Sequence, residues 1–373
     1  MQHIQTFFLL FFLLGLLSTF EKKIIKEKNR NIGIKEIAER ANVSIGPVDK
    51  VLHNRGGVSE KTRLRILKAI KELDYKPNIL ASRLKSKKEY NLAILLPQGT
   101  QQIPFWFEHQ KGFERIRKEL DQFGINLETF HFDQNSASSF TTKLNKVIKG
   151  KYDGIFMVPV FYNETIRLLR HAGKTGTPVI FFDSNITDQG NLSFIGQNSR
   201  DSGYLAANLL DYGVSPEATL LVATIVRKDD NHIHFSAREA GFLAYFQEAN
   251  RKIIHYENKS GNDRAIEKEI TALLQREPGI EGIFVTNGIS KIAATVSQLN
   301  TNRYKLVGYD LTDENIFFLE KGIIHFLINQ QPDKQAYQGI KLFYEYLILK
   351  QPIAKSYYMP IDIVTRCNLK YYQ

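Results

Sequence analysis

The sequence predicts two structural classes in one chain: an all-α headpiece built around a helix-turn-helix, and an α/β body of two lobes with two doubly wound parallel sheets. Three observations support this prediction. Short amphipathic helices occupy residues 34–85, apolar runs alternate with amphipathic helices after residue 88, and positive charge is concentrated before residue 91. A chain of 373 residues is long enough for a small first domain and a larger body.

The first two helices of the headpiece are predicted from IKEIAERANVS at residues 34–44 and from the residues that follow. Asn42 and Val43 form a tight turn, and Ser44 is a good N-cap for the second helix. Pro47 falls in the first turn of that helix, where an N–H group would have no helical partner. The apolar residues at helical spacing are Ile34, Ile37, Ala38 and Ala41 in the first helix and Val48, Val51 and Leu52 in the second.

A third helix is predicted after the chain break at Gly56 and Gly57, with Ser59 as its N-cap. The apolar residues expected on one side of this helix are Leu64, Leu67, Ile70 and Leu73. Small residues that let two short helices cross closely, with a valine beneath the turn, are typical of a helix-turn-helix.

The charge distribution points to the same part of the chain. Residues 21–90 contain 19 Lys and Arg against nine Asp and Glu, a net charge of +10, whereas the whole chain carries +11. The body is therefore close to neutral. A basic run alone is often a solvated surface, but one that coincides with a helix-turn-helix indicates a surface that neutralises phosphate groups.

The α/β body is predicted from about ten short apolar runs that are separated by amphipathic helices. The expected strands are residues 92–97, 127–132, 154–160, 179–183, 192–196, 219–225, 253–256, 282–287, 305–310 and the run that ends at 330. The expected helices include residues 111–123, 140–149, 202–212, 238–249 and 264–276. Strand–helix alternation favours parallel sheets, and about ten strands exceed one comfortable sheet, so two lobes are expected.

Several expected strands end in a polar residue: Asp183, Asn287, Asp310 and Gln330. Open α/β sheets bind ligands beyond the carboxyl ends of their strands, so these side chains are expected to face one cleft. Arg238 begins the helix after residues 219–225 and can reach the same cleft, and Phe105 and Trp106 follow the first strand. Carboxylates and amides bind hydroxyl groups in pairs while rings cover apolar C–H faces, which suits a sugar.

Each of these residues also has a simpler interpretation. A strand-end Asp is often a helix N-cap, and a single Trp is more often part of a core than of a ligand site. Their joint placement favours the cleft. His232 and His234 lie just before Arg238 and could line it; a metal site of two histidines is an alternative that no adjoining carboxylate cluster supports.

Residues 32–85 resemble the DNA-binding headpiece of the LacI family of bacterial transcription regulators. The matching segments are IKEIAERANVS, VDKVL, VSEKTR and LDYKPNILASRL. The last segment also supplies the family's hinge, in which Asn78 caps residues 79–85 and Leu84 stands where the family inserts a leucine into the minor groove. Such an apolar wedge partly unstacks a base step and kinks the duplex. The alternative for Leu84 is an ordinary linker leucine.

The resemblance implies DNA contacts from the recognition helix and from the hinge: Ser44, Ile45, Gly46, Asp49, Lys50, His53, Asn54, Asn78, Ser82, Leu84 and Lys85. Ile45 and Gly46 depart from the family, which usually reads bases there with larger polar side chains. Asp49 and Lys50 must then carry more of the contact, and Lys50 is favoured for a guanine edge or a phosphate.

The body resembles the periplasmic-binding-protein-like effector domain, especially its ribose/galactose-type branch, so the resemblance extends from residue 32 to about residue 368. The branch places an aromatic pair, Asp, Arg, Asn, Asp and Gln in its cleft in the chain order found here: Phe105, Trp106, Asp183, Arg238, Asn287, Asp310 and Gln330. Ser184 and Asn185 stand where an Arg is frequent, which leaves the exact sugar open. The expected domains are an apolar leader (1–20), headpiece (31–77), hinge (78–88), and effector and dimerisation domain (89–373).

No catalytic pattern is found in the sequence. It contains no GxxxxGK[ST] phosphate loop, no GxGxxG after the first strand and no GxSxG elbow. Asp183 and Asp310 could be taken for a glycosidase pair, but the binding pattern accounts for them better. The single Cys367 excludes an intrachain disulfide framework and zinc-type cysteine spacing. We therefore expect no enzyme activity, no cofactor and no metal.

Residues 7–17, FFLLFFLLGLL, are apolar enough for the core of a signal peptide but shorter than the ~20 residues that span a bilayer. Three interpretations are open. The translation start is mis-assigned and the protein begins near Glu21, which is favoured; the chain is a membrane-tethered regulator; or it is an exported binding protein. The mass of the native N-terminus distinguishes them.

The sequence thus favours a cytoplasmic, dimeric, sequence-specific regulator that binds operator DNA. In this hypothesis a small sugar or sugar derivative bound between the lobes controls DNA binding. The alternative is a membrane-tethered or exported solute-binding protein whose headpiece no longer reads DNA. The leader favours the alternative, whereas the basic headpiece and the hinge favour the regulator.

Overall fold

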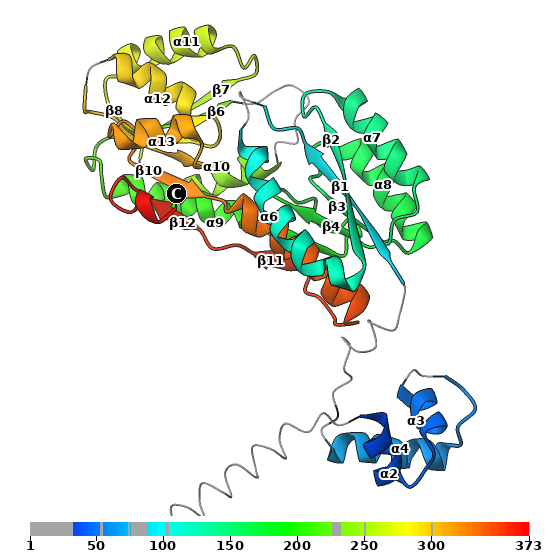
Figure 1. The fold of residues 1–373 in the computed structure, drawn as a ribbon. Coiled ribbons are helices and arrows are strands. Elements are labelled where there is room, and N and C mark those ends of the chain that lie inside the picture. The colour runs from blue at the N-terminus through cyan, green and yellow to red at the C-terminus, as the bar shows by residue number, and fades with distance from the viewer. Residues whose placement is uncertain are drawn as a thin grey trace, which may run out of the picture. The chain divides into compact units, whose positions relative to one another are not determined.

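The computed structural model describes residues 33–52, 55–73, 75, 88–100, 104–225, 233–249, 251–299 and 301–372. The chain divides into two compact units, residues 1–85 and 86–373 (Figure 1). The apolar leader and the predicted hinge contacts Asn78, Ser82, Leu84 and Lys85 lie outside the described residues. Within the described ranges, no helix combines the length and the apolar character needed to cross a bilayer.

The described part of the first unit contains helices α2 (Ile34–Ala41), α3 (Ile45–Leu52) and α4 (Glu60–Glu72). Asn42 adopts a left-handed conformation, with φ of 50°, and its N–H closes the end of α2 by donating to the Ala38 and Glu39 carbonyls. The Ser59 hydroxyl accepts the N–H of Thr62 at 3.3 Å, so the predicted N-cap of α4 is confirmed. The buried core comprises Ile37, Ala38, Ala41, Val48, Ile66 and Ala69.

The predicted apolar side of α4 is wrong in its first half. Leu64 is 60% exposed and Leu67 is 44% exposed, whereas Ile66 and Ala69 face the core. Residues spaced by three advance about 300° around a helix, so a run of such steps drifts about 60° each time and leaves the packed face. The buried face instead follows the mixed spacing of three and four residues.

Lobe 1 is a six-stranded sheet in the order β11-β5-β4-β3-β1-β2, and all of its pairs are parallel. Its strands are β1 (Tyr90–Pro97), β2 (Ile125–Phe132), β3 (Gly154–Met157), β4 (Val179–Phe182), β5 (Ser193–Gly196) and β11 (Ser356–Tyr358). Helices α7 (Ala137–Lys149) and α8 (Tyr162–Thr175) cover one face, and α6 (Phe105–Leu120) and α14 (Pro332–Phe343) cover the other (Figure 1).

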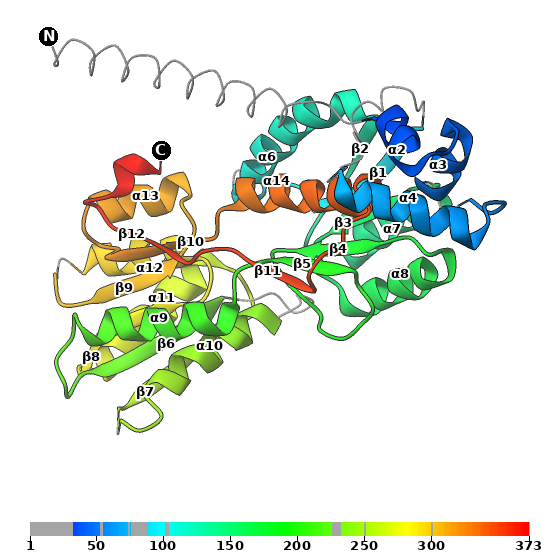
Figure 2. The ribbon, with the colours of Figure 1, turned by 90° about the horizontal axis from the view of Figure 1, so that it is seen from below.

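Lobe 2 is a second six-stranded sheet in the order β12-β10-β9-β8-β6-β7, in which β12 runs antiparallel to β10 and the other pairs are parallel. Its strands are β6 (Thr219–Ile225), β7 (Ile253–Asn258), β8 (Ile280–Val285), β9 (Lys305–Tyr309), β10 (Phe326–Asn329) and β12 (Asp362–Val364). Its helices are α9 (Ser199–Asp211) and α10 (Ile233–Tyr245) on one face, and α11 (Asp263–Arg276), α12 (Ile289–Gln298) and α13 (Asp313–Glu320) on the other (Figure 2). The predicted pair of doubly wound sheets is confirmed.

The chain passes between the lobes at residues 196–199, 329–332 and 358–362. Gln197, which is 4% exposed, ties these passages together, because its Nε2 donates to the Asn329 carbonyl at 2.8 Å and to the Pro360 carbonyl at 2.9 Å. The strand order reverses beside β1 and β6. Ligand sites of open α/β sheets form at such points, beyond the carboxyl ends of the strands.

Some predicted bounds are wrong. Helix α10 begins at Ile233, so Arg238 lies in its second turn and does not begin the helix. Helix α6 begins at Phe105, six residues earlier than predicted. Its N-cap is Pro104, which offers no capping side chain, so the sequence has no capping signal at the true start. Strands β11 and β12 have three residues each and are absent from the prediction, since such short strands carry no periodic pattern.

Candidate functional site

The carboxyl ends of the strands enclose a cavity of about 90 Å³ between the lobes. It is lined from lobe 1 by Trp106, Gln134, Val158, Val160, Asp183 and Ser184, and from lobe 2 by His234 and Phe235. Of the predicted ligand residues, Trp106 and Asp183 line this cavity. Its lining does not include the other five: Phe105, Arg238, Asn287, Asp310 and Gln330.

Arg238 is the centre of the lobe 2 side. It is 4% exposed, and its guanidinium lies over the Tyr309 ring, with Cζ 3.6 Å from the ring centroid. Its Nη1 donates to the Thr286 carbonyl at 2.6 Å, and its Nη2 donates to Oε1 of Gln330 at 2.7 Å. Its Nε has no hydrogen-bond partner among the described residues. Burial and fixed bonds hold the charge in one position.

Gln330 extends this arrangement to the second predicted carboxylate, because its Nε2 donates to Oδ1 of Asp310 at 2.6 Å. Asp310 directly follows β9 and has a φ of 76°, a left-handed conformation that turns its side chain at the strand end. The Tyr309 hydroxyl shares a 2.8 Å hydrogen bond with Ser202 of α9. Arg238, Gln330 and Asp310 thus form one bonded chain.

Asp183 lines the cavity from lobe 1, directly after β4, and also has positive φ, 64°. Its N–H donates to Oε1 of Gln335 at 3.0 Å, whereas its carboxylate makes no hydrogen bond within the described part of the chain. Burial raises the pKa of Asp183 to about 7; the positive charge of Arg238 lowers it and the negative charge of Asp310 raises it further. Burial also raises the pKa of Asp310, against its hydrogen bond from Gln330 and the charge of Arg238.

The aromatic pair forms the lobe 1 wall. Trp106 is 7% exposed, and its Nε1–H donates to Oε1 of Gln134 at 2.6 Å. Phe105 packs edge-on against Trp106, with centroids 4.9 Å apart, and His109 stacks beneath the indole. Burial lowers the pKa of His109 to about 3, so this ring is neutral. Phe105 therefore supports the ring that faces the cavity.

Asn287 follows the end of β8, as predicted, and its side chain bonds the neighbouring strand. Its Oδ1 accepts the N–H of Ile225 at 2.9 Å, and its Nδ2 donates to the Ile225 carbonyl. Both groups of its amide therefore fix the end of β6, and a ligand contact by Asn287 remains a prediction.

Sequence reasoning missed Gln134, Phe235 and Gln335. Gln134 follows the end of β2 by two residues, so the strand-end rule would have found it. Phe235 lies in the first turn of α10, whose start was misplaced. Gln335 is fully buried in α14, and no pattern in the sequence marks it.

The candidate DNA-binding surface is formed by the N-terminal part of α3. Ser44, Ile45, Gly46 and Lys50 are exposed, with Ile45 at 47%, and Val48 points into the core. Asp49 is half-buried and forms an ion pair with Arg55 at 3.3 Å. A Cβ at Gly46 would meet nothing within 4 Å, so the α3 backbone is open to close approach there. The predicted contacts His53 and Asn54 lie outside the described residues.

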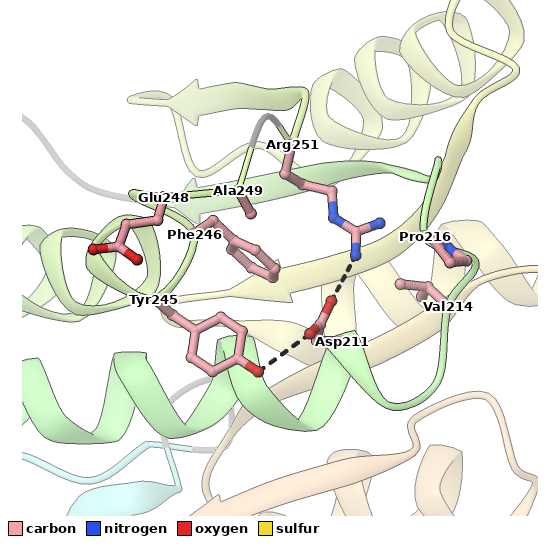
Figure 3. A pocket seen from close by; sticks show the side chains of 8 residues that line it. All are labelled: Asp211, Val214, Pro216, Tyr245, Phe246, Glu248, Ala249 and Arg251. Carbon is pink, nitrogen blue, oxygen red and sulfur yellow. Dashed lines mark hydrogen bonds and ion pairs between the residues drawn. The ribbon is translucent and has the colours of Figure 1, made fainter.

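Figure 3 shows a second hollow, of about 560 Å³, between the C-terminal ends of α9 and α10. The Asp211 carboxylate lies 2.5 Å from the Arg251 guanidinium and accepts from the Tyr245 hydroxyl at 3.2 Å. Arg251 also donates to the Ser215 carbonyl at 2.6 Å. These polar groups bond one another, unlike the carboxylate of Asp183. Across the described ranges, no group of three or more His, Cys, Asp or Glu side chains could hold a metal ion.

Two family models match the chain. Residues 93–351 match the family model described as a periplasmic binding protein domain, and residues 33–78 match that of bacterial regulatory proteins of the lacI family.

The chain is 26% identical over 338 residues to the sucrose operon repressor of Streptococcus mutans, covering 88% of this chain and 97% of that one. It is 25% identical over 345 residues to the ribose operon repressor of Bacillus subtilis, covering 89% and 97%. A crystal structure from Bacteroides fragilis, described as a LacI transcriptional regulator, superposes with a TM-score of 0.69 at 28% identity, over 77% of this chain and all of that one.

Proposed function

The chain belongs to the family of periplasmic binding protein domains and joins such a domain to a lacI-family DNA-binding domain, and from this premise we propose that it is a repressor whose operator binding is controlled by a small sugar held between the lobes. The observation that carries the proposal is the bonded chain of Arg238, Gln330 and Asp310, whose charges act on Asp183, next to the cavity that Asp183 and Trp106 line. Such a set offers paired acceptors to hydroxyl groups and a ring to a C–H face.

The ligand roles follow from the contacts. Asp183 has a carboxylate with no hydrogen bond among the described residues, so it is the first acceptor for a sugar hydroxyl. Arg238 has an Nε without a partner among the described residues, so it can donate to a ligand. Gln330 bonds both Arg238 and Asp310 and so fixes the Asp310 carboxylate, the second acceptor. Trp106 supplies the ring surface. Repressors of sucrose and ribose operons are among the relatives, which supports a sugar as the ligand class.

The DNA role rests on the headpiece. An exposed α3 N-terminus with Ser44, Gly46 and Lys50 fits a recognition helix in a major groove. The proposed arrangement is a cytoplasmic homodimer, with headpieces (31–77) on two half-sites, hinges (78–88) at the operator centre and effector domains (89–373) joined to each other.

The decisive experiment selects bound duplexes from a random DNA pool, using the full chain and a form that starts at Glu21. Recovery of an inverted repeat is expected, since two symmetric subunits read two half-sites. A panel of neutral sugars, beginning with D-ribose and sucrose, is then tested for release of the selected duplex by fluorescence anisotropy.

Arg238→Ala is the matched variant, expected to bind the duplex but not to respond to the sugar. Sequence-blind, salt-sensitive binding by both forms of the chain would contradict the regulator and favour a solute-binding protein. A sharp operator that no sugar releases would contradict only the ligand class.

A further inference from the structure

Gln335 is completely buried and joins the two sides of the cleft. Its Oε1 accepts the N–H of Asp183 at 3.0 Å, and its Nε2 donates to the carbonyl of Gln330 at 2.8 Å. Asp183 belongs to lobe 1, whereas Gln330 directly follows β10 of lobe 2, in the connection to α14. One side chain therefore holds the backbone of two candidate ligand residues, one from each lobe.

Helix α14 carries Gln335 and is locked onto lobe 1. A Cβ at Gly112 of α6 would lie 1.9 Å from the Asp333 carbonyl oxygen, and one at Gly339 would lie 2.2 Å from the Phe156 ring. Helix α14 is thus in backbone contact with α6 and in ring contact with the sheet, so it moves with them as a rigid element. Its 12 residues extend about 18 Å away from the cleft.

The other end of this element reaches the start of β1. A π-helical turn, η2 (Tyr344–Ile348), continues α14, and its Leu347 carbonyl accepts the Tyr90 hydroxyl at 3.4 Å. Tyr90 is 5% exposed and is the first residue of β1, and the Lys88 ammonium lies 4.6 Å from its ring centroid. Residues 76–87 lead from the headpiece to this point in the chain. Short π-helical turns are frequent at functional sites.

We propose that Gln335 is a positioning residue that couples occupancy of the cleft to the start of β1 through α14 and η2. The inference rests on the proposed function, in which a ligand engages Asp183 on one side and the Gln330–Asp310 chain on the other. A ligand that alters the separation of these groups alters both hydrogen bonds of Gln335, and the rigid helix carries the displacement to Leu347 and Tyr90. Coupling of this kind is reciprocal, so a change at Tyr90 alters Asp183.

The test uses the full chain without any ligand, measured by hydrogen–deuterium exchange with mass spectrometry. The Asp183 N–H donates both to Oε1 of Gln335 at 3.0 Å and to the Ile195 carbonyl at 3.1 Å. In Gln335→Leu it keeps only the Ile195 carbonyl, and its exchange is expected to rise about threefold. The distant amides of Leu349 and Gln351, which donate to the Tyr344 and Glu345 carbonyls, are expected to exchange about two to three times faster.

Gln338→Leu, a half-buried position on the same helix, is the matched control and should leave both regions unchanged. Faster exchange confined to residues 183–185 and 331–336 would overturn the coupling, since it would show a local structural role. Because no ligand is used, this outcome leaves the proposed function intact. Gln335→Met keeps the unbranched shape of the side chain and gives the same test if the leucine variant folds poorly.

The reciprocal variant, Tyr90→Phe, removes only the hydroxyl that bonds Leu347. It is expected to speed exchange of the Asp183 amide about twofold, and to have no further effect in a Gln335→Leu background. An unchanged Asp183 amide in Tyr90→Phe, or two effects that simply multiply in the double variant, would overturn the proposal.

Discussion

The two sides of the cleft differ in how their polar groups are bonded. On the lobe 2 side, Arg238, Gln330 and Asp310 form a closed chain with contacts of 2.7 and 2.6 Å, and the guanidinium lies on the Tyr309 ring. On the lobe 1 side, the Asp183 carboxylate makes no hydrogen bond within the described residues and stands beside the Trp106 ring. The three groups of lobe 2 are therefore fixed by their own bonds, whereas the Asp183 carboxylate of lobe 1 keeps its bonding capacity.

The largest expected effect comes from breaking the lobe 2 side at its centre. Arg238→Ala leaves two buried carboxyl groups without their shared positive charge. The affinity for the sugar that releases the operator should therefore fall more than about 100-fold, roughly 3 kcal/mol. Isothermal titration calorimetry measures this loss, and operator affinity without sugar should stay unchanged. Arg276→Ala, at a side chain that is 74% exposed, is the control. Tight sugar binding by Arg238→Ala would show that the Arg238 guanidinium is not part of the ligand site.

The next effect tests the lobe 1 wall. Trp106→Ala removes the ring surface and should weaken sugar binding about tenfold, whereas Trp106→Phe keeps a ring, loses only the bond to Gln134, and should cost about threefold. The same calorimetric titration measures both variants. Equal losses in the two would show that the hydrogen bond, and not the ring, is what matters.

A smaller effect on binding is expected at Asn287. Its amide bonds both backbone groups of Ile225, so Asn287→Ala should lower the free energy of unfolding by about 1–2 kcal/mol. Sugar affinity should fall by less than about fivefold. Denaturant unfolding and titration of the same sample separate the two quantities. A hundredfold loss of affinity with unchanged stability would instead make Asn287 a direct ligand contact.

The smallest effect is the pH dependence of stability that Asp183 produces. Its pKa is raised to about 7 in the folded chain, so the stability that its protonated form contributes is complete below about pH 4 and is lost as the pH rises through about 7. Asp183→Asn removes this loss. Its melting temperature should match that of the unmodified chain near pH 4 and exceed it by a few degrees at pH 8. Asp188→Asn, an exposed position with φ of 59°, should follow the unmodified chain throughout.

Much of the fold could be predicted because buried parallel strands read as continuous apolar runs. Residues 92–96 of β1 are all buried, and the pattern of apolar runs predicted this strand and its neighbours. The headpiece core could be predicted for α2 and α3. It could not for Leu64 and Leu67, because successive steps of three residues drift off the packed face of α4, where Ile66 and Ala69 lie. Helix α14 was not among the predicted helices.

The candidate site was partly predictable for a related reason. The carboxyl end of a strand fixes the direction of the next side chain, so Asp183, Asp310 and Gln330 could be brought to one cleft from sequence position alone. Gln335 could not, because its partner Asp183 is 152 residues away and their contact depends on how α14 packs. Asn287 follows a strand end as the rule requires, yet its amide bonds the backbone of Ile225 at the end of β6.

The chain contains a single tryptophan, and its indole is the ring that faces the cavity. Light absorbed by tryptophan alone is therefore emitted from one place, beside Asp183 and bonded to Gln134. A ligand that covers the ring or replaces water there changes the colour and yield of that emission. Trp106 is thus an intrinsic fluorescence probe, and cleft occupancy can be followed in the unmodified chain, in real time, while it is bound to DNA.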